Sequence, residues 1–136
     1  MALIPDIGSV MTSAPLTIDI SASIREAQNM MSGKGIRHLP IMDGDKVVSV
    51  LSDRDINLAL VAIQGMSDSD ELAVEDVCTL HTYSVTSSTP LDEVVTTMAE
   101  KHIGSVLVID NDKLAGIFTA TDACKYLGMC MRGEIS

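Results

Sequence analysis

Apolar and polar positions follow the same order twice along the chain. In the second half, a helix with one apolar face is predicted by apolar residues spaced i, i+3, i+4, i+7 and i+8, which are Leu91, Val94, Val95, Met98 and Ala99. A weaker pattern of the same kind in the first half comprises Ile24, Ala27, Met30 and Met31. We therefore expect one amphipathic helix at the same place in each half.

Each predicted helix follows a short extended segment and precedes two apolar runs. The extended segments are 16–20 and 83–87, and the apolar runs, which predict strands, are 39–42, 47–51, 106–109 and 114–118. Gly44 and Asn111 occupy the same turn between the runs, and because both residue types tolerate positive φ, each pair is predicted to be a hairpin. Final helices are expected to begin near Asp53 and Ala120, so each half has the order strand, helix, strand, strand, helix.

The two halves are copies of one another. A shift of 67 residues, which places Val10 on Val77 and Leu60 on Leu127, aligns the halves without a gap and makes twelve pairs identical. An ungapped match of this length indicates internal duplication, which determines the architecture. We expect repeat 1 at residues 1–64, a linker at 65–72 and repeat 2 at 73–136, together forming one compact module.

Charge and composition argue against several classes of function. The formal net charge of −10 repels phosphate backbones, so we expect no nucleic-acid partner. The apolar runs are shorter than the roughly 18 residues of a membrane helix, and the first residues lack the basic start of a secretory signal, so we expect a cytoplasmic protein without a membrane partner. Cys78, Cys124 and Cys130 lack the spacing of a zinc site or a disulfide framework, which predicts reduced thiols and no metal site.

A Ser or Thr followed three residues later by Asp stands at the predicted junction of the last strand and the last helix in both repeats. The pairs are Ser52 with Asp55 and Thr119 with Asp122. One interpretation is a capping box, in which the hydroxyl and the carboxylate accept hydrogen bonds from backbone N–H groups at the helix start. The other is a pair of groups that binds the vicinal hydroxyls of a ribose, as acidic residues do in dinucleotide folds.

The order, spacing and duplication of three motifs resemble the cystathionine-beta-synthase (CBS) domain family. The motifs are Val10-Met11-Thr12 with Pro15-Leu16-Thr17-Ile18, then Gly35-Ile36-Arg37-His38-Leu39-Pro40-Ile41, and then Leu51-Ser52-Asp53-Arg54-Asp55-Ile56. The resemblance covers nearly the whole chain. It implies an α+β, α/β sandwich-like fold of two β-α-β-β-α repeats related by a pseudo-twofold axis, in a stand-alone tandem pair whose two clefts can each hold an adenosine derivative.

The resemblance also implies a set of ligand-binding residues in each cleft. The Ser or Thr and the Asp would hold the ribose, backbone groups near the first strand would meet the adenine edge, and two apolar side chains would form its walls. In the first cleft these residues are Ser52, Asp55, Thr17, Ile18, Ile36 and Val50. In the second cleft they are Thr119, Asp122, Ser84, Val85, Ile103 and Ile117.

Cationic side chains for a phosphate group are expected only in the first cleft. Arg37, His38 and Arg54 lie where the family often places phosphate contacts, and their charge suits that role. In the alternative, the two arginines pair with acidic residues and His38 is structural. The corresponding residues of repeat 2 are Gly104, Ser105 and Thr121. The second cleft is therefore expected to take a less charged adenosyl ligand, to use cations from across the cleft, or to stay empty.

The functional hypothesis is a regulatory module that binds AMP, ADP, ATP or S-adenosylmethionine as its regulatory ligand and requires no cofactor. Its signal would pass through a homodimer interface or to a separate effector protein. The alternative is a scaffold for dimerisation or protein interaction that binds no ligand. The sequence has no P-loop and no recognisable spacing of a nucleophile with a base, so we expect no enzymatic activity.

Overall fold

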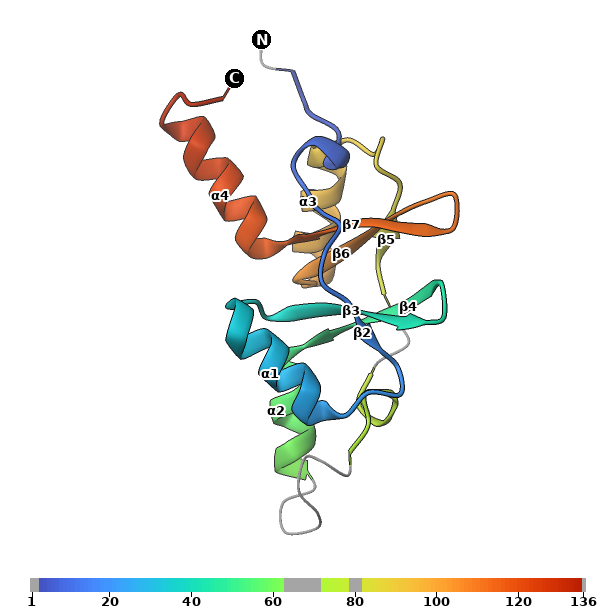
Figure 1. The fold of residues 1–136 in the computed structure, drawn as a ribbon. Coiled ribbons are helices and arrows are strands. Elements are labelled where there is room, and N and C mark those ends of the chain that lie inside the picture. The colour runs from blue at the N-terminus through green and yellow to red at the C-terminus, as the bar shows by residue number, and fades with distance from the viewer. Residues whose placement is uncertain (1–2, 63–71, 79–81, 136) are drawn as a thin grey trace. The chain divides into compact units, whose positions relative to one another are not determined.

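The computed structural model describes residues 3–62, 72–78 and 82–135 and has an α+β fold with the same element order in both repeats (Figure 1). Repeat 1 contains β2 (Ile18–Asp19), α1 (Ile24–Lys34), β3 (His38–Asp43), β4 (Lys46–Ser52) and α2 (Asp53–Ala62). Repeat 2 contains β5 (Ser84–Val85), α3 (Leu91–Lys101), β6 (Ser105–Asp110), β7 (Lys113–Thr119) and α4 (Ala120–Met131). The predicted fold class is confirmed. Of the predicted linker 65–72, all residues but Leu72 lie outside the described ones.

Each repeat folds its strands into one sheet. β2 pairs in parallel with β3, and β3 pairs antiparallel with β4; β5, β6 and β7 pair in the same way. The sheet of repeat 2 has a further short strand, β1 (Thr12–Ser13), antiparallel to β7, which the sequence patterns did not predict. Both predicted hairpins are confirmed, and the turn residues have positive φ, 65° at Gly44 and 52° at Asn111.

The segment that opens each repeat packs with the other repeat. We call Leu16–Thr82 the repeat-1 unit, and Met1–Pro15 with Tyr83–Ser136 the repeat-2 unit. Ile7 is fully buried in the core of the repeat-2 unit, and its equivalent Val74 is fully buried in the core of the repeat-1 unit. The backbone N–H groups of Ile7 and Val74 donate to Thr89 O and Ala22 O, each at 2.8 Å. Each unit is thus completed by a segment of the other sequence repeat.

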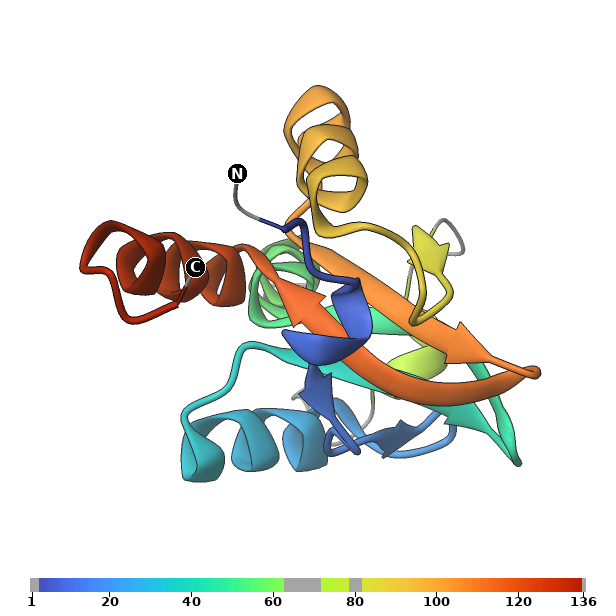
Figure 2. The same cartoon turned by 90° about the horizontal axis from the view of Figure 1, so that it is seen from above.

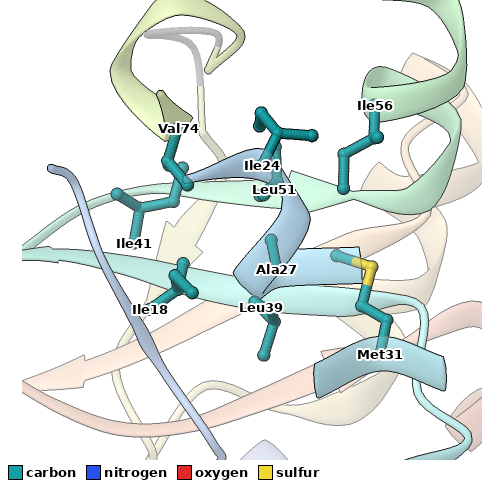
Figure 3. Packing of buried hydrophobic residues seen from close by; sticks show 9 residues of the cluster. All are labelled: Ile18, Ile24, Ala27, Met31, Leu39, Ile41, Leu51, Ile56 and Val74. Carbon is teal, nitrogen blue, oxygen red and sulfur yellow. The ribbon is translucent and has the colours of Figure 1, made fainter. Parts of the chain in front are cut away.

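The repeat-1 unit buries its apolar side chains between the sheet and two helices, which lie on the same face of that sheet (Figure 1). Figure 3 shows this core, which comprises Ile18, Ile24, Ala27, Met31, Leu39, Ile41, Leu51, Ile56 and Val74. The core of the repeat-2 unit comprises Ile7, Leu91, Val94, Met98, Val106, Val108 and Phe118. α2 contributes the buried Ile56 to its core, whereas α4 has no buried residue.

The first helix of each repeat ends on a left-handed residue. Gly35 follows α1 with a φ of 65°, which glycine adopts without a steric penalty. His102 takes the same position after α3 with a φ of 56°. The next residue then turns back toward the helix, and the N–H groups of Ile36 and Ile103 donate to Met31 O and Met98 O, each at 3.0 Å. This turn places the following residues at the start of β3 or β6.

Candidate functional site

The Ser52 and Asp55 side chains form a reciprocal capping box at the junction of β4 and α2. The Asp55 N–H donates to Ser52 Oγ at 3.0 Å, and the Ser52 N–H donates to Asp55 Oδ2 at 3.1 Å. Both residues are half-buried. The cap interpretation of this motif therefore describes what the side chains do in the structure.

Thr119 and Asp122 repeat this arrangement at the junction of β7 and α4. The Thr119 N–H and hydroxyl lie 3.0 and 3.1 Å from Asp122 Oδ2, and the Asp122 N–H donates to Thr119 Oγ1 at 3.3 Å. The two junctions share the pair of reciprocal hydrogen bonds between side chain and backbone, and the Thr119 hydroxyl adds a bond to the carboxylate that is not present between Ser52 and Asp55. The duplicated motif has one structural role in both repeats.

The capping boxes leave part of each carboxylate available. The side chains of Asp55 and Asp122 accept hydrogen bonds through Oδ2, and within the described part of the chain Oδ1 of each accepts none. A carboxylate oxygen can accept hydrogen bonds from the vicinal hydroxyls of a sugar. The cap and the ribose interpretations are therefore compatible, because the cap orients the carboxylate that a ribose would contact.

The predicted apolar and backbone contacts lie on the strands around each junction. Ile18, Val50 and Ile117 are buried, while Ile36 and Ile103 are half-buried at the turns that precede β3 and β6. The remaining predicted residues lie directly before or on the first strand of each repeat and are Thr17, Ser84 and Val85. Of the predicted apolar walls, Ile36 and Ile103 are thus partly accessible, whereas Val50 and Ile117 are buried.

The predicted phosphate contacts are side chains at the start of β3 and in the first turn of α2. Arg37 and Arg54 are exposed, and neither forms an ion pair with any residue in 3–62, 72–78 or 82–135. The alternative in which these arginines pair with acidic residues is therefore not what the described structure contains. His38 is half-buried at the first position of β3. In repeat 2 the same positions hold the uncharged Gly104, Ser105 and Thr121.

A pocket of about 470 Å³ lies where the C-terminal turns of α1 meet the first turns of α2. It is lined by Gln28, Met31, Ser32, Gly35, Ile36, Arg37, Asp53, Ile56 and Asn57. Ile36 and Arg37 belong to the predicted ligand-binding set, but Ser52 and Asp55 do not line this pocket. Sequence reasoning missed its four other polar residues. Helical i, i+4 spacing, which pairs Gln28 with Ser32 and Asp53 with Asn57, was the available signal.

In the repeat-2 unit the N-terminal segment runs near α3 and α4 (Figure 2). Residues of these three elements line a groove of about 440 Å³. It is lined almost entirely by apolar residues, which are Leu3, Ile4, Pro5, Leu91, Val95, Ala123, Tyr126, Leu127 and Cys130, together with Asp92. Leu127 is 58% exposed. Desolvation raises the pKa of Tyr126, and a hydrogen bond with Cys130 raises that pKa further. Sequence reasoning did not single out this groove.

None of the helices in the described residues is both long enough and apolar enough to cross a bilayer. No group of three or more His, Cys, Asp or Glu side chains in the described residues is arranged to hold a metal ion. Cys78, Cys124 and Cys130 form no disulfide.

Comparison with known proteins gives curated relatives that are much longer than this chain. Homoserine O-acetyltransferase of Methanosphaera stadtmanae is 30% identical over 112 residues, which are 81% of this chain and 21% of that enzyme. L-aspartate semialdehyde sulfurtransferase of Methanocaldococcus jannaschii is 30% identical over 121 residues, which are 88% of this chain and 22% of that enzyme. The chain spans about a fifth of the length of these relatives, so their whole-protein activities do not follow for it.

Solved structures match over almost their whole length. AcuB from Vibrio cholerae has a TM-score of 0.81 and 27% identity, with 96% of this chain and 98% of that chain covered. The CBS domain pair of protein MJ0100, in complex with 5′-methylthioadenosine and S-adenosyl-L-methionine, has a TM-score of 0.78 and 27% identity, with 93% and 98% covered. The sequence itself matches the CBS domain over residues 7–62 and again over 74–128. The CBS domain thus matches twice in one chain, and the two matched segments have the same order of helices and strands. This chain therefore belongs to the CBS domain family and contains a tandem CBS pair.

Proposed function

We propose that the chain is a regulatory module that binds an adenosine-containing ligand and does not turn it over. The observation that carries this proposal is the duplicated Ser/Thr and Asp pair, whose capping box fixes a carboxylate with one unused oxygen in each repeat. Such an oxygen suits a ribose diol. The similarity to the MJ0100 domain pair, which was solved with two adenosyl ligands, supports the same ligand class.

The first cleft is proposed to take a phosphorylated ligand. Ser52 and Asp55 would hold its ribose, Thr17 and Ile18 would meet the adenine edge, and Ile36 and Val50 would form the apolar walls. Arg37 and Arg54 are exposed cations without an acidic partner in the described structure, so they can bind phosphate oxygens. His38 lies beside Arg37 at the start of β3 and would add a third contact.

The second cleft is proposed to take an adenosyl ligand of lower charge. Its ribose would bind Thr119 and Asp122, and its adenine would lie near Ser84, Val85, Ile103 and Ile117. Gly104, Ser105 and Thr121 supply no positive charge. A phosphate in this cleft would therefore lack the charge-assisted hydrogen bonds that are proposed for repeat 1.

Thermal denaturation with AMP, ADP, ATP or S-adenosylmethionine tests the ligand class. A ligand at about 100 times its Kd adds about 2.7 kcal/mol to the free energy of unfolding, so at least one of them should raise the melting temperature clearly. GMP is the matched control for the adenine contacts. No shift with any of the four ligands at millimolar concentration would contradict the proposal. Detectable turnover of a bound nucleotide would contradict the absence of catalysis.

Asp55→Asn and Asp122→Asn separate the two clefts without removing the caps. An asparagine Oδ1 can still accept the backbone N–H of Ser52 or Thr119, but its amide group replaces the second carboxylate oxygen. Isothermal titration should show that each variant loses one binding event and keeps the other. Unchanged AMP affinity in Asp55→Asn would exclude the proposed first cleft.

A dimerisation scaffold that binds no ligand is the second candidate, and the apolar groove of repeat 2 favours it. Leu3, which lines the groove, is 87% exposed, and Met131, the last residue of α4, is 78% exposed. In a twofold contact the same surface patch of both copies meets, so the groove of one copy can receive the protruding apolar side chains of the other. α4 carries one acidic and one basic residue, Asp122 and Lys125, so two copies can meet there despite a net charge of −10. A dimer that responds to no adenosyl ligand would support this candidate.

A further inference from the structure

The pocket of the repeat-1 unit has the size and lining of a small-molecule site that is separate from the Ser52 and Asp55 pair. Its volume of about 470 Å³ lies within the range of roughly 300–1,000 Å³ that ligand pockets occupy. Met31 from α1 and Ile56 from α2 lie at the same end of the buried cluster and provide an apolar floor (Figure 3). Polar side chains from both helices and from the turn after α1 complete the lining.

Two opposite charges line this pocket without neutralising one another. Arg37 and Asp53 are joined through the backbone, because the Asp53 N–H donates to Arg37 O at 3.0 Å. Their side chains form no ion pair, so the guanidinium nitrogens and the carboxylate oxygens lie more than 4.0 Å apart. Neither side chain has a hydrogen bond within 3–62, 72–78 or 82–135. The pocket therefore offers one cation and one anion to the same ligand.

A ligand that satisfies both groups must itself carry a negative and a positive charge close together. An isolated phosphate would be attracted by Arg37 but repelled by Asp53. An isolated amine would be attracted by Asp53 but repelled by Arg37. An α-amino acid group presents a carboxylate and an ammonium a few ångströms apart. Gln28, Ser32 and Asn57 add amide and hydroxyl groups that can satisfy the remaining hydrogen bonds.

We propose that this pocket binds an α-amino acid group, with the carboxylate on Arg37 and the ammonium on Asp53. The group is either a free amino acid or the amino acid end of S-adenosylmethionine. The site shares Ile36 and Arg37 with the proposed first cleft but uses neither Ser52 nor Asp55. With S-adenosylmethionine as the ligand it rests on the proposed adenosyl function, and with a free amino acid it does not.

Repeat 2 lacks every polar side chain that this site needs. The residues equivalent to Gln28, Ser32, Arg37, Asp53 and Asn57 are Val95, Ala99, Gly104, Ala120 and Cys124. The apolar floor is partly retained, since Met98 is equivalent to Met31. The amino acid site is therefore a property of repeat 1 alone, and one event per chain is expected.

Isothermal titration of the full chain with each standard α-amino acid, S-adenosylmethionine, 5′-methylthioadenosine and AMP tests the proposal. 5′-Methylthioadenosine has the adenosyl group without the amino acid group, so it isolates the contribution of the pocket. In Asp53→Asn and Arg37→Gln, affinity for the ligand with the amino acid group should fall about tenfold to a hundredfold, because a charged group loses its partner. AMP affinity should be unchanged or higher in Asp53→Asn, since a negative charge is removed.

Asp55→Asn, on the same turn of α2, is the matched control, because the adenosyl proposal needs Asp55 and the pocket does not. Binding of a free amino acid that is lost in Asp53→Asn but kept in Asp55→Asn supports a free amino acid as the ligand. A preference for S-adenosylmethionine over 5′-methylthioadenosine that disappears in Asp53→Asn supports the adenosyl-linked group.

The proposal is overturned if no free amino acid binds and S-adenosylmethionine affinity is the same in Asp53→Asn. It is also overturned if amino acid binding is insensitive to both pocket variants. Because Asp53 begins α2, Asn57→Ala provides a second pocket variant, and circular dichroism with the melting temperature confirms that each variant is folded. If a free amino acid binds but none of the adenosyl ligands does, the adenosyl proposal is rejected and the amino acid proposal stands.

Discussion

The face of repeat 1 at which α1 meets α2 carries five polar side chains, whereas the equivalent positions of repeat 2 hold small or apolar residues, which are Val95, Ala99, Gly104, Ala120 and Cys124. In repeat 1 this face surrounds a pocket with Arg37, Asp53 and Asn57 in its lining. In repeat 2 it borders a groove that is lined by Val95 and Ala123. Apart from the added strand β1, the order of strands, the hairpins and the reciprocal caps are nevertheless the same in both repeats.

One further substitution between the repeats concerns how the last helix of each repeat is packed. Ile56 is 1% exposed and belongs to the repeat-1 core together with Met31, whereas its equivalent in repeat 2 is the smaller Ala123. A smaller side chain leaves less apolar contact between the two helices, and α4 has no buried residue. The junction motif is thus the same in both copies, while the helix surfaces differ in polarity and packing.

The largest expected effect comes from removing the side chain that ties α2 to α1. Ile56→Ala should lower the free energy of unfolding by about 2–5 kcal/mol, because it removes a fully buried side chain and leaves a cavity. Urea denaturation measures this change. Leu58→Ala on the same helix is the control, since Leu58 is 61% exposed and should change stability by no more than about 0.5 kcal/mol. Equal losses in both variants would mean that Ile56 does not anchor α2.

The next effect concerns association through the apolar groove. Leu127→Asp should weaken a homodimer by about 3 kcal/mol or more, because each copy would lose the burial of one leucine. Sedimentation velocity over a range of concentrations measures the dimer Kd. Leu58→Asp is closely matched, with 61% exposure against 58% for Leu127, but it lies in the other repeat and outside the groove. A dimer that is unaffected by Leu127→Asp, or dissociated equally by both, would place the contact elsewhere.

The fold could be predicted because each signal was local and was present twice. Helical spacing, turn residues such as Gly44 and the offset of 67 residues define the elements without any long-range information. The strand β1 and the burial of Ile7 in the repeat-2 unit could not be predicted in this way. Both result from a segment that packs with the other repeat, and nothing in its own periodicity indicates its partner.

The site could be predicted only in part for a related reason. The Ser52 and Asp55 pair is a short sequence motif, so it was found, and in the structure the side chain of each accepts a hydrogen bond from the backbone N–H of the other. The pocket collects Gln28 from one helix and Asn57 from another, which lie far apart in the sequence and form no motif. The groove likewise joins Leu3 to Leu127, and only the folded chain brings these residues together.

Removal of the two caps should affect the repeats differently. Ser52→Ala should lower the free energy of unfolding by about 1 kcal/mol. Since α2 packs in the core through Ile56, a less stable helix start should destabilise the whole fold. Thr119→Ala should lower it by less than about 0.5 kcal/mol and should instead speed hydrogen exchange of the Asp122 amide about fivefold, because α4 can fray locally. Ser52→Thr and Thr119→Ser keep the acceptor and serve as controls. Equal global losses would show that α4 is as firmly anchored as α2.

The smallest expected effect comes from giving the second cleft the cation that only the first possesses. Thr121→Arg places a guanidinium at the position of Arg54, in an Asp55→Asn background where only the second cleft should bind. AMP affinity should rise about two- to fivefold, since an exposed charge contact contributes about 1 kcal/mol or less. Adenosine, which lacks the phosphate, should bind unchanged, and the gain for AMP should shrink at high salt. Isothermal titration at two salt concentrations measures both effects. An equal gain for adenosine would mean that the arginine acts by packing, and the difference in charge between the two clefts would then not determine which ligand each one prefers.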